Sequence, residues 1–158
     1  AALARVLESG EFGADERASW QTRLAGWMHR LRRHLLRYPA VLSLIGRSGR
    51  TSPAWLEASS ELVEILEQAG LSGRDLAATY LWILETTCGL VMEEAALSLP
   101  EQIANARAAR GELSPKTRAR FAPIVAEIDR IDGDAFFAFA VEQAEAVVEL
   151  RRRSRERS

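Results

Sequence analysis

The chain has 158 residues, of which 47% are hydrophobic and 27% are charged, values that fit one globular domain and exclude wholesale disorder. The net charge of −1 hides an uneven distribution, because residues 1–50 hold nine Arg against four acids while residues 51–150 hold seven Lys or Arg against seventeen acids. The acidic middle repels phosphate, so only the Arg-rich ends could contact DNA, and we expect no sequence-specific DNA binding by this chain.

The composition also bears on localisation. The single cysteine, Cys88, has no partner for a disulfide, which suits a reducing cytoplasm. No signal-peptide pattern opens the sequence and no stretch of about 20 apolar residues follows, so we expect neither secretion nor a membrane partner. The sequence begins at Ala1 already in a helical pattern, and we expect an N-terminal portion to precede it.

The first long helix is expected at residues 16–38, after the end of another helix at 1–9 and a loop rich in glycine and acids at 10–15. Its apolar residues recur at steps of three and four, which is typical of an amphipathic helix, and Pro39 ends it. The opposite side is basic, and we interpret it as a solvated face: Arg23, Arg30, Arg33 and Arg37.

A short apolar helix is expected at residues 40–45 and a longer one at 53–69, where Ser52 and Pro53 form a typical helix start. The central helix, at 75–97, is apolar on more than one face, so it must be buried on several sides. Its polar middle argues against a membrane span. We therefore expect one face to pack on its own domain and the other on a partner.

The second half continues with a weakly amphipathic helix at residues 100–110 and another at 115–131, where Pro123 predicts a kink or a split. The last helix is expected at 135–153, followed by a solvated basic tail at 154–158. No segment alternates as a strand does. The pattern predicts an all-α fold, an antiparallel bundle of about six or seven helices.

Familiar catalytic and metal-binding patterns are missing from the sequence. His29 and His34 are five residues apart on one helix and form no metal-ligand motif. The chain lacks a Gly-rich phosphate loop and a nucleophile motif, so we expect no enzyme, no cofactor and no metal. Glu85 is the one acid inside an apolar helix, and either a cationic ligand, an interface hydrogen bond or simple exposure would explain it.

Aromatic residues and methionines are concentrated on three of the expected helices. The three helices at 16–38, 53–69 and 75–97 each point an aromatic ring inward. Such side chains suit either an ordinary core or an apolar ligand pocket. Periodicity alone leaves both alternatives open.

Four local patterns, in this order, resemble the C-terminal domain of tetracycline-repressor (TetR) family transcriptional regulators. They are W-x3-L-x2-W-x3-L-x3-L-x2-Y-P at 20–39, L-x3-L-x2-A-G-L-S at 62–72, T-x-C-G-L-V-M-E-E-A at 86–95 and D-A-F-F-A-F-A-V at 134–141. The resemblance rests on their order and spacing over nearly the whole chain, because no single pattern is highly specific.

The resemblance implies a homodimer in which the central and last helices of two subunits form a four-helix bundle. It also implies a pocket for a small hydrophobic effector, and operator DNA as a partner through an N-terminal domain absent from this sequence. Residues 1–9 would then end the linking helix and 16–153 would form the ligand-binding and dimerisation domain. The magnesium ligands of the tetracycline-binding member have no matching positions, so we carry over neither metal nor antibiotic.

Two sets of residues follow from these expectations. The expected ligand-binding residues are Trp20, Leu24, Trp27, Met28, Leu31, Trp55, Leu62, Leu66, Tyr80, Leu84 and Thr87. The expected dimer-interface residues are Ala78, Trp82, Thr86, Gly89, Phe136, Phe139, Ala140 and Val147. Three functions compete: an effector-sensing repressor domain, a dimerisation scaffold whose aromatics are only core, and a helical enzyme.

Overall fold

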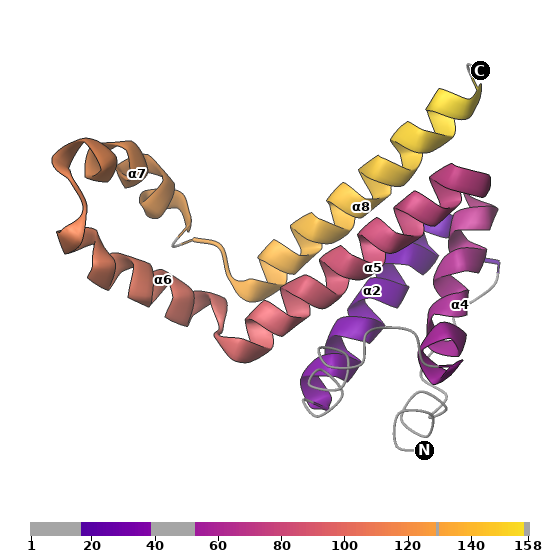
Figure 1. The fold of residues 1–158 in the computed structure, drawn as a ribbon, viewed down its shortest axis with the longest axis horizontal. Helices are drawn as coiled ribbons and strands as arrows, with labels where there is room; N and C mark the ends of the chain where they lie inside the picture. Colours follow the sequence, from indigo (N-terminus) through magenta and orange to yellow (C-terminus); the bar gives the residue numbers. More distant parts are fainter. Residues whose placement is uncertain (1–16, 39–52, 129, 157–158) are drawn as a thin grey trace.

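The computed structural model of the chain describes residues 17–38, 53–128 and 130–156 (Figure 1). The helices expected at 1–9 and 40–45 lie outside these residues. The described part contains six α-helices and one 3-10 turn, and no strand. The expectation of an all-α fold is confirmed. None of the described helices is long and apolar enough to cross a membrane.

Helices α2 and α4 begin or end where the sequence supplies a cap. Helix α2, Trp20–Arg37, starts after Ser19, whose side chain accepts a hydrogen bond from the backbone N–H of Thr22 at 3.2 Å. Helix α4 is Pro53–Gln68. Gly70 follows its end, and the φ of 87° at this glycine permits a Schellman turn in which the Leu71 N–H donates to the Leu66 carbonyl at 3.0 Å.

The remaining helices follow from similar signals. Helix α5 is Gly73–Ala96, and α6, Leu99–Ala109, opens on a capping box formed by Ser98 and Glu101. The 3-10 turn η1, Arg110–Glu112, leads into α7, Pro115–Ile128. Of the kink or split expected at Pro123, the split is absent: α7 continues through Pro123 as one helix. Helix α8, Gly133–Glu156, runs three residues beyond its expected end.

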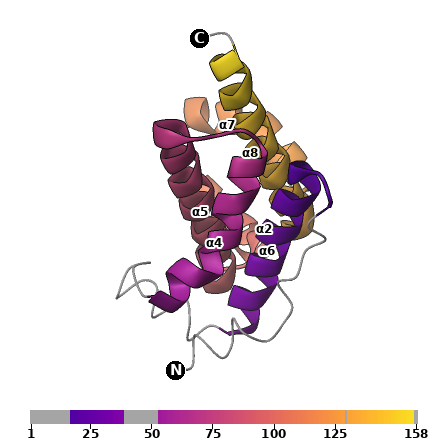
Figure 2. The same cartoon turned by 90° about the vertical axis from the view of Figure 1, so that its right-hand side faces the viewer.

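Four of the helices form the body of the domain. Helix α2 contacts α4, α5 and α8, and α5 contacts α4 and α8, as Figures 1 and 2 show. Their inward stripes form one apolar core. Its members include Leu24, Trp27, Met28, Leu31, Leu35, Trp55, Leu62, Ile65, Leu66, Ile83, Leu84, Cys88, Val91, Phe137, Val141, Ala144 and Val148.

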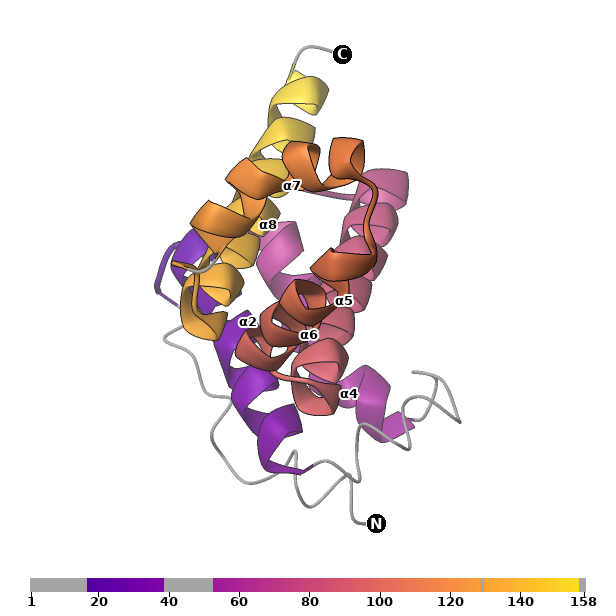
Figure 3. The same ribbon diagram turned by 90° about the vertical axis from the view of Figure 1, so that its left-hand side faces the viewer.

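Helices α6 and α7 form an arm, residues 99–128 with η1 between them, that projects from the body (Figures 1 and 3). Neither helix contains a buried residue. The arm leaves the body where α5 ends and returns where α8 begins. The bundle is therefore smaller than the sequence suggested, because two of the six described helices lie outside it.

Candidate functional site

The expected ligand-binding residues come together in the core of the body. Nine of the eleven are buried, with exposed fractions of 4% or less, and they come from α2, α4 and α5. Trp20 and Tyr80 are partly buried and pack against this core. We call the eleven residues the aromatic cluster. The structure places them side by side, while their role in binding a ligand stays a prediction.

Polar groups inside the aromatic cluster differ in whether they have a partner. The Thr87 hydroxyl donates to the Ile83 carbonyl at 2.7 Å, and the Tyr80 hydroxyl shares a 2.8 Å hydrogen bond with Ser59. Both hydroxyls, which we expected to bind a ligand, thus already have protein partners. The indole N–H of Trp27 is buried and has no hydrogen-bond partner among the described residues. A buried donor without a partner costs about 1–3 kcal/mol.

Ser59 was missed by the sequence analysis. It is 3% exposed and lies on the buried stripe of α4, four residues after Trp55 and three before Leu62. The spacing of that stripe could have identified it, because position 59 continues the same helical face. Its hydroxyl fixes the position of the Tyr80 hydroxyl, so Ser59 belongs to the polar lining of the aromatic cluster.

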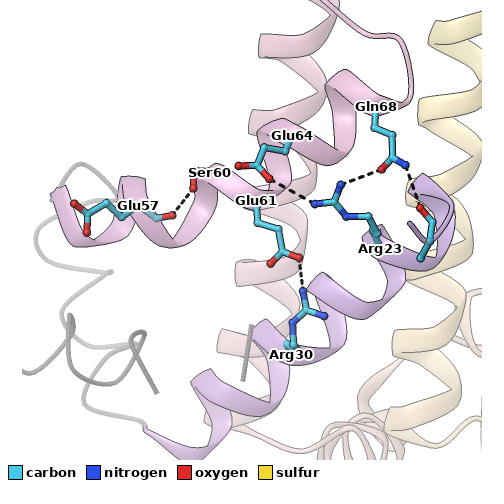
Figure 4. Close-up of polar contacts among 8 residues, drawn as sticks. Arg23, Arg30, Glu57, Ser60, Glu61, Glu64 and Gln68 are labelled. Carbon is cyan, nitrogen blue, oxygen red and sulfur yellow. Dashed lines mark hydrogen bonds and ion pairs between the residues drawn. The ribbon is translucent and has the colours of Figure 1, made fainter. Parts of the chain in front are cut away.

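Ion pairs close the seam between α2 and α4 on one side of the aromatic cluster (Figure 4). The Arg30 guanidinium lies 2.7 Å from a Glu61 carboxylate oxygen. Arg23 donates to Gln68 at 3.0 Å and lies 3.5 Å from Glu64. The expectation of a solvated basic face is therefore wrong for Arg23 and Arg30, because acids of α4 draw them into the seam.

The other two arginines of that face, Arg33 and Arg37, are exposed as expected. The difference follows from the position of α4. Its acidic residues at 61 and 64 lie opposite the first three turns of α2, so they pair with Arg23 and Arg30 and not with the two arginines further along this face. The pattern of charges along one helix does not show which of those charges a neighbouring helix will cover.

A second ion cluster joins α2 to the two helix ends that carry the arm. The Arg32 guanidinium donates twice to Glu94, at 2.8 and 2.6 Å, and lies 2.7 Å from Asp134. It also lies 4.8 Å from the ring centroid of Phe137. The hydrogen bonds with Glu94, more than any other contact, raise the pKa of Arg32 above its ordinary value. We call these three charged residues the Arg32 clamp.

The expected dimer residues lie mostly on an exposed outer face of α5 and α8. Trp82, Phe136 and Phe139 are 40%, 42% and 54% exposed. Ala78 and Gly89 are also exposed, and Thr86 and Val147 are half-buried. Ala140 is only 9% exposed and packs mainly within its own subunit. The same outer face also exposes Leu81, Met92 and Leu150, which the sequence analysis did not include.

Clefts of the described part lie at the rim of the body and at the root of the arm. One of about 550 Å³ is lined by Trp20, Gln68, Ala69, Gly70, Arg152 and Arg155. A smaller one of about 150 Å³ lies at the root of the arm, between α5, α6 and the start of α8.

Within the described ranges, no group of three His, Cys, Asp or Glu side chains is placed to hold a metal ion. Glu85 is exposed and Cys88 is buried.

Comparison with known proteins gives one positive result. Residues 12–143, well over half of the chain, match the family model described as the tetracyclin repressor-like C-terminal domain. Comparison with curated proteins and with solved structures gives no match. The matched range contains α2, α4, α5, the arm and the first half of α8. The chain belongs to the tetracyclin repressor-like C-terminal domain family.

Proposed function

We propose that this domain senses a small hydrophobic effector and forms a homodimer as part of a TetR-like transcriptional repressor of the cytoplasm. Operator DNA would be bound by a separate N-terminal domain and released when the effector binds. The observation that carries the sensing role is the buried indole N–H of Trp27, which lacks a partner among the described residues. It lies inside the cluster that the sequence singled out for ligand binding.

The chemistry of the aromatic cluster defines the effector that it suits. Leucine, methionine and tryptophan side chains surround Trp27, so most of the ligand surface must be apolar. Trp27 offers one donor, so a ligand with one well-placed oxygen acceptor gains a hydrogen bond that the empty protein lacks. A flat aromatic ketone has both properties. Binding between α2, α4 and α5 would change their packing and, through the linking helix, the spacing of the DNA-binding domains.

A matched pair of probes tests this proposal. Fluorenone and fluorene share one flat tricyclic shape, but only fluorenone has a carbonyl acceptor. We expect both to raise the melting temperature followed by circular dichroism, because a ligand that binds only the native state stabilises it. Fluorenone should bind more tightly, by about fivefold for a hydrogen bond of about 1 kcal/mol.

Trp27→Phe separates the contribution of apolar packing from that of the hydrogen bond, because it keeps an aromatic ring and removes the N–H. The variant should lose the preference for fluorenone and still bind fluorene. The control is Trp82→Phe, which removes an indole N–H that lies outside the aromatic cluster and is 40% exposed. Because Trp82 belongs to the proposed dimer interface, the control is judged by its preference for fluorenone over fluorene and not by its melting temperature alone. Absence of stabilisation by either probe, up to its solubility limit, would contradict the sensing role. The domain would then be a dimerisation scaffold with an ordinary aromatic core.

We propose the outer face of α5 and α8 as the homodimer interface. Gly89 lies inside the 24-residue helix α5, and a Cβ at this position would meet no atom within 4 Å. Glycine there costs the isolated helix about 0.5–1 kcal/mol relative to alanine. A partner helix that approaches Gly89 closely would explain its presence. Together with the exposed Trp82, Phe136 and Phe139, it marks the centre of an interface that should bury about 2,000 Å² or more.

Gly89→Arg tests the interface. The open space around Gly89 lets the monomer accept an arginine, so the fold should persist while the dimer dissociates in sedimentation velocity. Ser60→Arg, at an exposed position of α4, is the matched control and should leave the dimer intact. A dimer unchanged by Gly89→Arg would show that subunits associate elsewhere.

A further inference from the structure

The larger of the two clefts described above lies at the end of the body where α8 ends and the chain turns from α4 into α5 (Figures 1 and 2). Its volume of about 550 Å³ falls within the range of about 300–1,000 Å³ that small-molecule sites occupy. We call it the rim cleft. The effector site and the dimer interface proposed above use neither of the arginines that line it, Arg152 and Arg155.

Arg155 is held in place across the rim cleft with donors to spare. Its Nη1 donates to the Gly70 carbonyl at 2.9 Å, which joins the end of α8 to the turn after α4. This is the one hydrogen bond of Arg155 among the described residues. Its Nε and Nη2 groups also carry N–H donors, and these can reach a further acceptor. Arg155 is therefore oriented before any ligand arrives.

Arg152 adds a second guanidinium one turn earlier on α8. Its Nε and Nη2 donate to Glu149 at 3.0 and 2.9 Å, so its half-buried side chain is also fixed. Glu149 offsets part of this positive charge. Residues 149–158 nevertheless carry five Arg and two Glu, a net charge of +3. The α8 side of the rim cleft is therefore electropositive and rich in hydrogen-bond donors.

The α2 and α4 sides of the rim cleft combine an aromatic ring with a buried cation. Trp20 is partly buried, packs against the core and lines the cleft. Gln68 accepts a hydrogen bond from Arg23 at 3.0 Å and donates to the Ala18 carbonyl at 3.1 Å (Figure 4). The Arg23 side chain is only 9% exposed, and its Nε–H has no hydrogen-bond partner among the described residues. Arg23 thus adds positive potential behind Gln68, which Glu64 at 3.5 Å offsets in part.

We propose that the rim cleft binds a planar aromatic carboxylate. The carboxylate would accept hydrogen bonds from Arg155 and Arg152, because a guanidinium matches its two oxygens. The ring of the ligand would lie against Trp20, which offers a flat apolar surface. The site differs from the aromatic cluster in its charge, since a neutral ketone suits the single donor of Trp27 and an anion suits two guanidinium groups. The proposal does not rest on the proposed effector or on the proposed dimer.

The rim cleft stays accessible in the proposed homodimer. Leu150 belongs to the outer face of α8 and is 59% exposed. Arg152 and Arg155 lie roughly 140–200° around the helix from Leu150, on the side that faces α4. A ligand in the cleft would join the end of α8 to the first turn of α2, and it would stabilise the native state by mass action.

Three probes separate the charge from the ring. Naphthalene-2-carboxylate and naphthalene-2-carboxamide share one shape, but only the carboxylate is an anion, while acetate has the carboxylate without the rings. In calorimetric titrations of the full chain at about 0.15 M salt, the naphthalene carboxylate should bind about tenfold more tightly than either of the others. Equal binding of the carboxamide would overturn the anion site. Equal binding of acetate would overturn the aromatic contact.

Arg155→Gln tests the arginine, and Arg151→Gln is the matched control. Both remove one positive charge from the same turn of α8, but Arg151 is exposed, does not line the rim cleft and lies 3.9 Å from Asp75. Arg155→Gln should weaken carboxylate binding about tenfold, and Arg155→Lys should recover only part, because an ammonium lacks the planar fork. Equal weakening by Arg151→Gln would show a general charge effect and overturn the site.

Trp20→Leu gives a second readout that does not involve charge. It should weaken the carboxylate and the carboxamide by similar factors, because both would use the ring contact. Circular dichroism of each variant shows whether the body has kept its fold. Unchanged binding of both probes to a folded Trp20→Leu variant would contradict the assigned ring position.

Trp27→Phe distinguishes the rim cleft from the aromatic cluster, because Trp27 is 1% exposed and does not line the cleft. If Trp27→Phe weakens carboxylate binding and Arg155→Gln does not, the probe binds in the core and the rim cleft is wrong. If fluorenone fails to bind while the carboxylate behaves as expected, the proposed effector site is wrong and the rim cleft stands.

Discussion

The body and the arm contain similar amphipathic helices, but the apolar stripes of these helices differ in burial. Helix α4 has an apolar stripe with Leu62 and Leu66, and α7 has one with Phe121 and Ile124. The α4 stripe is fully buried, while the two α7 residues are about half exposed. An amphipathic pattern thus predicts that a helix forms and that its apolar face is stabilised by burial. The pattern does not show whether the residues that bury this face belong to the same subunit.

The largest expected difference between the two regions is in stability. Leu66→Ala removes a side chain that is 0% exposed, so it should lower the free energy of unfolding by about 2–5 kcal/mol. Ile124→Ala, at a position 53% exposed, should lower it by under about 0.5 kcal/mol. Urea unfolding of dilute, monomeric protein measures both. Equal losses would show that the arm belongs to the cooperative core.

A smaller effect is expected at the Arg32 clamp, where body and arm meet. Arg32→Ala leaves Glu94 and Asp134 without the guanidinium that both bind, and should cost about 1–3 kcal/mol of unfolding free energy. Arg32→Lys should recover only part of it, because an ammonium lacks the planar fork that binds Glu94 twice. The exposed neighbour Arg33→Ala is the control, and a loss as large at Arg33 would refute the clamp.

The smallest expected effect is on acid stability. Hydrogen bonds from Arg152 and Arg153 lower the pKa of Glu149 from 4.5 to about 2. A carboxyl group with a lower pKa in the folded state stabilises the fold above its unfolded pKa and loses that contribution as the pH falls. Stability should therefore decline between pH 4.5 and about 2. Because the ion pairs are largely exposed, the effect should be small and sensitive to salt.

A pair of variants relates this pH dependence to the comparison of body and arm. Glu149→Gln, in the body, should reduce the pH dependence of global unfolding. Hydrogen bonds from Ser98 lower the pKa of Glu101 at the start of α6 as well. Glu101→Gln should nevertheless leave global unfolding unchanged, because the arm is not part of the core. Urea titrations at pH 5 and pH 2.5 measure both, and a large effect of Glu101→Gln would contradict this division.

Much of the fold was determined by the sequence alone. Local signals act within a few residues of a helix start. A serine lies directly before each of α2, α5, α6 and α7: Ser19, Ser72, Ser98 and Ser114. The broad apolar surface of α5 is present in the structure: one face is buried in the core, and the other exposes Leu81, Trp82 and Met92, so its packing on a partner stays a prediction. The same reasoning brought the aromatic cluster together, since three inward stripes in one small domain must meet in one core.

Only the tertiary structure decided which neighbour each side chain meets. It drew Arg23 and Arg30 into the seam with α4, joined Arg32 to Glu94 and Asp134, and left Phe121 and Ile124 uncovered. It also showed that Tyr80 and Thr87 already have partners while the Trp27 N–H has none among the described residues. These contacts join residues distant in the chain, and their geometry follows from helix packing, which periodicity along one helix does not specify.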